Sequence, residues 1–147
     1  MRFEASTRAS PERVRRALTD FSDRRLQILN RTLDPKTYEV REHGETWAVA
    51  KESTPGSPYW VVARYDWSEP MVVRWTIVES SYGGHDTGSV RIAPTGDGGS
   101  RLNVEWSYTD ISRTRDKVML SLIQRFPMSR MISRMWVSAL DRYAETD

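Results

Sequence analysis

Hydrophobic and polar residues change their spacing several times along the chain, and each change marks a different kind of element. Near the N-terminus, Phe3 and Ala5 alternate with polar neighbours, which predicts a short strand. From Tyr38 onwards the apolar positions again recur at every second residue. This period predicts six further strands, at about residues 37–43, 46–53, 59–67, 72–80, 88–95 and 101–109.

Residues typical of turns separate these six strands. They include Pro70, the pair Gly83-Gly84 and the segment GDGGS at Gly96–Ser100. The last of these lacks the Lys-Ser/Thr and the following helix of a phosphate-binding loop, so it is interpreted as a hairpin turn. Parallel neighbours would need crossovers of about a dozen residues or more. The short connections therefore predict an antiparallel meander.

Two helices are predicted between the first strand and the meander. Ser10 is a favourable N-cap and Pro11 suits the first helical position. The apolar residues that follow share one helical face: Val14, Ala17, Leu18 and Phe21. We expect this helix to end near Asp20, and a second short helix, capped by Ser22-Asp23, to extend through Leu29.

The segment from about Ser112 to Ala144 is predicted to be helical, because its apolar residues recur at spacings of three and four. These residues are Met119, Leu122, Ile123, Phe126, Ile132, Met135, Trp136, Ala139, Leu140 and Tyr143. Pro127 removes one backbone hydrogen bond and predicts a kink. Since the apolar stripe resumes after the proline in nearly the same phase, one kinked helix on a curved surface is expected.

Composition narrows the class of protein. The chain has 147 residues, no cysteine, and 22 basic against 20 acidic residues, for a net charge of +2. Its length suits one domain over residues 1–147, and the missing cysteines exclude disulfides, thiolate metal sites and a cysteine nucleophile. The mixed charge indicates a solvated surface rather than a nucleic-acid partner. With no signal peptide and no bilayer-length apolar segment, a cytoplasmic protein is expected.

The order β-α-α-β6-α resembles that of the START-like (SRPBCC) superfamily, as do ASPERVRRALTDFSD, YEVREHGETWAV and YWVVARYDWSEPMVVRWTIVES. That superfamily includes polyketide cyclases/dehydrases, lipid-transfer START domains and the birch-pollen-allergen type. The resemblance implies an α+β helix-grip fold, in which a curved antiparallel sheet wraps around a long C-terminal helix and leaves a hydrophobic cavity between them. The arginine bias and the family type favour a bacterial source.

Aromatic and methionine side chains are the candidate ligand contacts. The strand residues share parity with apolar neighbours and are expected to face inward: Tyr65, Trp67, Trp75, Trp106 and Tyr108. On the last helix the candidates are Met119, Ile123, Phe126 and Met135. For both groups the alternative interpretation is ordinary core packing, and only the family resemblance favours a pocket wall.

Charged strand residues and histidines are weaker candidates for chemistry. A desolvated acid or base among Arg64, Asp66, Arg74, Glu79 and Glu105 could transfer a proton, but four of these five residues have a parity opposite to that of the apolar set. They are therefore expected to form a charged ladder on the outer sheet face. The two histidines, His43 and His85, fall in or beside predicted turns and lack metal-ligand spacing, so no metal or cofactor is expected.

Three functions remain open at this point. The first is binding, possibly transport or sequestration, of a hydrophobic small molecule such as a lipid or polyketide-like metabolite. The second is a cyclase or dehydratase reaction on a polyketide-like substrate. The third is a START-like domain with a collapsed cavity that binds a protein partner. Binding is favoured over catalysis because the strand acids are predicted to face outward; the sequence leaves open whether the protein is a monomer or a homodimer.

Overall fold

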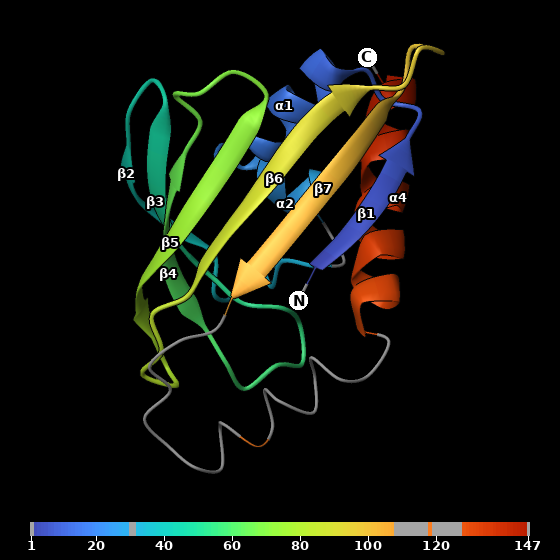
Figure 1. Ribbon diagram of the computed structural model, residues 1–147. Helices are drawn as coiled ribbons and strands as arrows, with labels where there is room; N and C mark the ends of the chain where they lie inside the picture. The colour runs from blue at the N-terminus through green and yellow to red at the C-terminus, as the bar shows by residue number, and fades with distance from the viewer. Residues whose placement is uncertain (1, 30–31, 108–117, 119–127, 147) are drawn as a thin grey trace.

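The computed structural model describes residues 2–29, 32–107, 118 and 128–146. Within these residues, seven strands form one antiparallel sheet in the order β1-β7-β6-β5-β4-β3-β2 (Figure 1). The strands are β1 (Arg2–Thr7), β2 (Glu39–His43), β3 (Trp47–Glu52), β4 (Val61–Asp66), β5 (Val72–Ser80), β6 (Thr87–Pro94) and β7 (Ser100–Ser107). The predicted meander is confirmed, and β1 closes it by pairing with β7.

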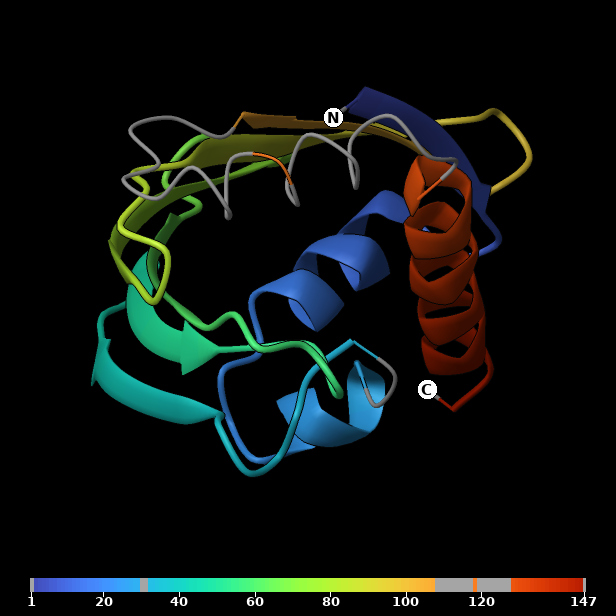
Figure 2. The same ribbon diagram turned by 90° about the horizontal axis from the view of Figure 1, so that it is seen from below.

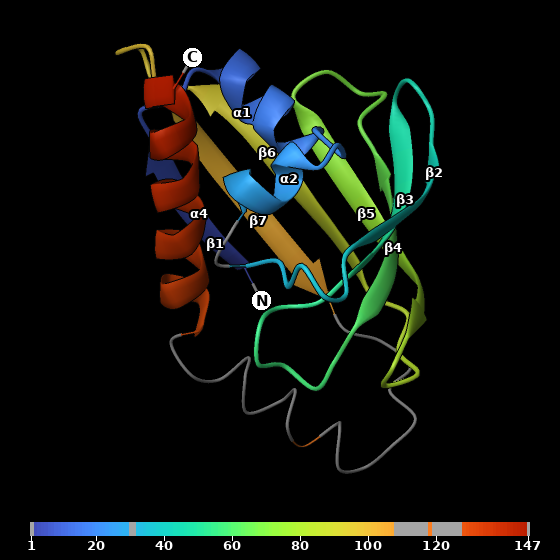
Figure 3. The same ribbon diagram turned by 180° about the vertical axis from the view of Figure 1, so that it is seen from behind.

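The sheet is strongly curved, and two short helices lie on its concave side (Figure 2). Register shifts leave one extra residue in each of two strands, Arg41 in β2 and Val78 in β5, and such bulges bend the strand that carries them. The helices α1 (Pro11–Leu18) and α2 (Arg24–Ile28) lie inside the curve, as the view from behind also shows (Figure 3). We refer to the side of the sheet that carries the helices as the concave face.

Local sequence explains where α1 starts and what it buries. The Ser10 hydroxyl accepts a hydrogen bond from the Arg13 amide at 3.3 Å, and Pro11 takes the first helical position, as predicted. The residues buried from this helix and the segment after it are those of the predicted apolar face: Val14, Ala17, Leu18 and Phe21. α1 ends at Leu18, and α2 ends just before Leu29.

The C-terminal helix α4 (Met128–Thr146) lies beside β1 at one edge of the sheet. Its C-terminal half is held by polar contacts with the last residue of β1 and the residue that follows it. The Asp141 carboxylate accepts hydrogen bonds from the Thr7 hydroxyl at 2.6 Å and the Arg8 amide at 2.9 Å. Leu140 is fully buried, and Phe3 meets Trp136 edge to face. The predicted helical residues 112–127 and the kink at Pro127 lie outside the described residues, except for Val118.

One turn has an unusual backbone. Met71 follows Pro70 between β4 and β5 and has a φ of 59°, in the left-handed region that favours glycine. The Val72 amide donates to the Glu69 carbonyl at 3.3 Å, so residues 69–72 form a turn with proline at its second position. Met71 also packs against the core and its carbonyl accepts from the Ile92 amide. The structure therefore retains a methionine where the backbone favours glycine.

Candidate functional site on the concave face

A row of aromatic side chains from three strands crosses the concave face. Tyr65 on β4, Trp75 on β5 and Trp106 on β7 all belong to, or pack against, the main core cluster. The ring centroids of Tyr65 and Trp75 are 6.4 Å apart, and those of Trp75 and Trp106 are 5.7 Å apart at 80°. We call these three residues the aromatic band. Gly88 on β6 pairs with both tryptophans in the sheet register.

A stack of three planar groups lies at one end of this band. Trp67 packs nearly parallel to Phe21, with ring centroids 5.6 Å apart and planes at 8°. The Arg25 guanidinium carbon lies 4.0 Å from the centre of the Phe21 ring. Such contacts hold a buried guanidinium through its interaction with the ring electrons. The stack fixes α2, which carries Arg25, against β4.

The same arginine belongs to a buried polar cluster, which we define as Arg25, Glu52 and Tyr65. Arg25 and Glu52 are each only 4% exposed. The Arg25 Nε donates to Glu52 Oε2 at 3.1 Å, and the Arg25 Nη1 donates to the Leu18 carbonyl at 3.0 Å. The Tyr65 hydroxyl donates to Glu52 Oε1. Each carboxylate oxygen of Glu52 therefore has a hydrogen-bond donor.

The surroundings keep Arg25 charged and the tyrosines neutral. Burial by itself would lower the pKa of Arg25, but attraction to the Glu52 carboxylate raises it overall. Burial, followed by the nearby Glu52 charge, raises the pKa of the Tyr65 hydroxyl well above its ordinary value. Burial likewise raises the pKa of Tyr38, whose hydroxyl donates to the Phe21 carbonyl, to about 12.

The buried polar cluster is better suited to holding the Tyr65 side chain in one orientation than to exchanging protons with a ligand. Glu52 is an acid in the interior, but Arg25 and Tyr65 occupy its two oxygens. The hydroxyl hydrogen bond fixes the Tyr65 ring within the aromatic band. The arrangement thus combines an apolar aromatic wall with one fixed polar group beside it, which suits an apolar ligand.

The structure brings together four of the nine predicted ligand contacts. Tyr65, Trp67, Trp75 and Trp106 face the interior, as strand parity predicted. Met135 is half-buried on α4. The other four lie outside the described residues: Tyr108, Met119, Ile123 and Phe126.

Sequence analysis missed Arg25, Glu52 and Phe21 as parts of this site. Glu52 could have been found, since it shares strand parity with the buried Ala48 and Ala50. No comparable signal distinguishes Arg25 from its neighbour Arg24, because α2 has only five residues and no clear apolar period. Phe21 was predicted as a core residue, and its role in the stack depends on where α2 docks.

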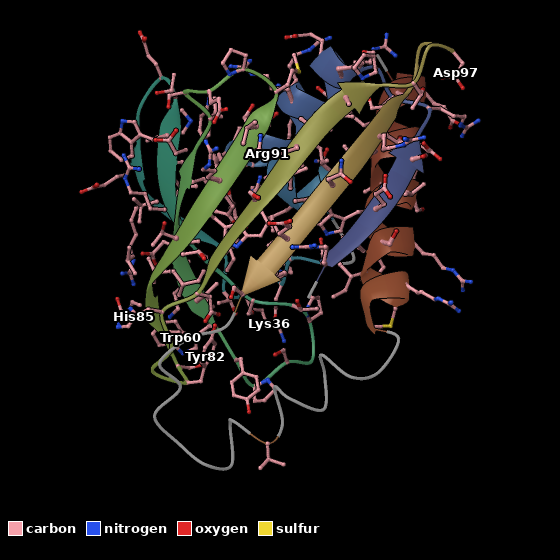
Figure 4. The ribbon with its side chains drawn as sticks, viewed as in Figure 1. Lys36, Trp60, Tyr82, His85, Arg91 and Asp97 are labelled. Atoms are coloured by element: carbon pink, nitrogen blue, oxygen red, sulfur yellow. The ribbon has the colours of Figure 1, made fainter. Side chains whose placement is uncertain are left out.

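The five charged strand candidates lie on the convex face or its rim, as the favoured interpretation predicted. Each has an oppositely charged partner. The ion pairs are Arg64–Asp66 at 3.5 Å, Arg41–Glu79 at 3.3 Å, Arg2–Glu105 at 3.1 Å and Arg74–Glu69. Arg91 also projects from this face of β6 (Figure 4). None of these groups supplies an acid or base to the concave face.

Metal binding and membrane crossing find no support in the part of the chain that the structure describes. No group of three or more histidine, aspartate or glutamate side chains there could hold a metal ion. His43, exposed at the end of β2, contacts the edges of Phe21 and Trp67, while His85 lies in the β5–β6 connection (Figure 4). No described helix is long and apolar enough to cross a membrane.

Comparison with protein families and solved structures agrees with this architecture. A family model described as polyketide cyclase / dehydrase and lipid transport matches residues 1–142. Among curated proteins, no relative matches the chain. The fold is the helix-grip fold of the START superfamily, with its curved antiparallel sheet and C-terminal helix.

Three solved structures illustrate the likeness. The Zhui aromatase/cyclase from Streptomyces sp. R1128 has a TM-score of 0.72 at 15% identity, over 99% of this chain and 92% of that one. Norcoclaurine synthase from Thalictrum flavum has a TM-score of 0.71 at 13% identity, over 100% and 86%. A START superfamily protein from Mycobacterium smegmatis has a TM-score of 0.72 at 11% identity, over 99% and 96%. At these identities the likeness concerns the fold.

Proposed function

Because this chain belongs to the polyketide cyclase / dehydrase and lipid transport family, we propose that it binds a hydrophobic small molecule on the concave face. The ligand is a lipid or a polyketide-like metabolite, held between the sheet and the C-terminal part of the chain. The aromatic band supplies the wall on the sheet side, and Met135 of α4 contributes from the helix side. Binding of this kind serves transport or sequestration in the cytoplasm.

The aromatic band is the observation that carries the proposal. Three large rings from β4, β5 and β7 lie beside one another on the inner face, and two of them, Tyr65 and Trp106, are only partly buried. Rings of this size offer apolar area together with a polar tip, a combination typical of small-molecule sites. The polar groups of the buried polar cluster already form hydrogen bonds with one another. We therefore expect the ligand to be recognised mainly by its shape and by apolar contacts.

A second candidate function is a cyclase- or dehydratase-like reaction in the same place. The inward position of Glu52 and Tyr65 favours it, since such a reaction needs an acid or base near the ligand. The solved structures of similar fold include an aromatase/cyclase and a synthase. We rank this function below binding because Glu52 is 4% exposed and both of its oxygens are already bonded.

Native mass spectrometry of the freshly purified protein, followed by organic extraction, tests the proposal. A bound lipid-like or polyketide-like species identified in the extract would support it. If an added polyketide-like compound is recovered unchanged, binding is supported, whereas recovery of a product lighter by one water supports the dehydratase. An empty protein that takes up no apolar probe would favour the remaining alternative, a partner-binding domain.

Two tryptophan replacements make the test specific to the concave face. Trp106→Ala removes a ring of the aromatic band and should weaken binding of the apolar probe N-phenyl-1-naphthylamine by about ten-fold or more. Trp47→Ala is the matched control, because Trp47 is also half-buried but lies on the convex face, where it contacts the Arg64 guanidinium. Equal weakening by both replacements would argue against a site on the aromatic band.

A further inference from the structure

Gly88 is an unusual residue for the middle of a sheet. Glycine is disfavoured inside strands, and its presence often marks a close approach of another group to the backbone. Here that group is Trp75 on the neighbouring strand. A Cβ atom built on Gly88 would lie 2.1 Å from Cε2 and Cζ2 of the Trp75 indole and 2.5 Å from its Nε1. The indole therefore occupies the volume that any side chain at position 88 would need.

The position of this contact links it to the aromatic band. Gly88 pairs with Trp75 on one side and with Trp106 on the other, so all three positions lie on the concave face. The Trp75 indole thus covers Gly88 of β6, with the Tyr65 and Trp106 rings at centroid distances of 6.4 and 5.7 Å. With a ring on each side and the backbone of β6 behind it, a displaced indole would have to move away from the sheet.

We propose that Gly88 is a specificity-determining residue that sets the depth of the concave face at the aromatic band. Without a side chain at position 88, Trp75 lies close to the sheet, and the space in front of it accepts a broad, multi-ring or branched apolar ligand. Any larger residue would push the indole into that space and select for a smaller ligand. This inference rests on the proposed function, because depth matters only if a ligand binds there.

The test compares two apolar probes of different size. 1-Naphthol has two fused rings, and N-phenyl-1-naphthylamine carries one ring more. In Gly88→Ala, the affinity for the larger probe should fall by about ten-fold or more, while the affinity for 1-naphthol changes by less than about three-fold. The measurement is a fluorescence titration of each probe, with near-ultraviolet circular dichroism to show that the variant is folded.

Three further variants distinguish a change in the depth of the concave face from a general disturbance of the fold. Ser89→Thr also adds one methyl group to β6, but Ser89 faces the convex side opposite Arg74 and Glu105, so both affinities should stay at the wild-type value. Trp75→Phe removes the indole atoms that a Cβ would meet, so the double variant Gly88→Ala/Trp75→Phe should regain the larger probe. Trp75→Phe alone is the reference for the double variant: once the indole is absent, the methyl group added at position 88 should change the affinity for the larger probe by less than about three-fold.

The outcomes distinguish the two proposals. If the wild type binds neither probe, the proposed function fails and this inference fails with it. If the wild type and folded Gly88→Ala bind both probes equally, only the depth inference is overturned. Should Gly88→Ala fail to fold, the double variant decides: a folded double variant that binds the larger probe about as tightly as Trp75→Phe supports the inference, whereas binding about ten-fold or more weaker than that of Trp75→Phe would overturn it.

Discussion

Replacing Glu52 with glutamine should destabilise the protein far more than the same replacement at Glu79. Glutamine keeps the shape of glutamate and one acceptor oxygen, but it removes the charge. In the native protein Arg25 and Glu52 have side chains only 5% and 6% exposed, and the pair is 3.1 Å apart. The Arg25 guanidinium would therefore remain buried without a counter-charge. Glu79 pairs with Arg41 at 3.3 Å, where the side chains are 55% and 39% exposed.

The expected magnitudes follow from this difference in exposure. Removing one partner of a buried ion pair costs about 3–5 kcal/mol, because the remaining charge loses its partner without regaining water. Exposed pairs contribute about 0–1 kcal/mol. For a domain of this size, each kcal/mol shifts the melting temperature by about 2–4 °C, so Glu52→Gln should lower it by about 6–20 °C. Glu79→Gln should lower it by less than about 4 °C.

Thermal and urea unfolding, followed by circular dichroism, measure both variants at neutral pH. A Glu52→Gln loss within about 1 kcal/mol of the Glu79→Gln loss would refute the reasoning, since it would mean that the buried pair is no stronger than an exposed one. The double variant Arg25→Met/Glu52→Leu provides a further check. It buries neither charge and should regain much of the stability. The recovery should be partial, because the Tyr65 hydroxyl loses its acceptor.

Three other predictions concern different parts of the fold. Burial raises the pKa of Tyr38 from 10.0 to about 12. The contribution of the neutral Tyr38 hydroxyl to the free energy of unfolding is therefore complete below pH 10 and is lost as the pH rises towards 12. Tyr38→Phe should reduce this loss of stability at alkaline pH, as measured by urea unfolding at several pH values. Asp141→Ala should cost about 1–3 kcal/mol in urea unfolding by leaving the buried Thr7 hydroxyl without its acceptor, whereas Asp141→Asn should cost less. At the left-handed position 71, Met71→Gly should be more stable than Met71→Ala by about 1 kcal/mol in thermal unfolding, and the reverse order would contradict the strain assigned to that turn.

Much of the sheet could be predicted from sequence because period and turn residues agree with each other. Within the described residues, each of the six meander strands begins within two residues of its predicted start, and the first five also end within two residues of their predicted ends. The predicted end of the last strand, at about residue 109, lies outside the described residues. The strand from Val72 to Ser80 matches at both ends, since Pro70 and the Gly83-Gly84 pair lie close on either side. Parity also placed Tyr65 and Trp75 inward and Arg64 outward, because one face of a curved sheet must bury its side chains.

The parts of the site that could not be predicted from sequence depend on contacts between elements that lie far apart in the chain. The Arg25–Glu52 pair joins α2 to β3, and the helix has too few residues for its buried face to be read from spacing. Glu52 itself has the strand parity of the buried Ala48 and Ala50, so its inward position can be predicted even though its partner cannot. The close approach of Trp75 to Gly88 depends on cross-strand register, which the sequence leaves open by one or two residues. The left-handed backbone at position 71 could not be predicted either, because the residue there is methionine and not the glycine or asparagine that usually marks this conformation.

The buried polar cluster and the aromatic band share Tyr65, and this shared residue connects stability to recognition. Its hydroxyl is committed to Glu52, and Glu52 is in turn held by Arg25, which is stacked on Phe21. The Tyr65 ring is therefore held in place before a ligand binds, by Glu52 of β3 and, through Glu52, by Arg25 of α2. A wall fixed in this way loses little conformational freedom on binding, which favours affinity for an apolar molecule. Tyr65→Phe should consequently weaken an apolar probe even though the ring itself is retained. If the probe binds Tyr65→Phe as tightly as it binds the wild type, the hydroxyl serves folding alone and the link between the cluster and the band is absent.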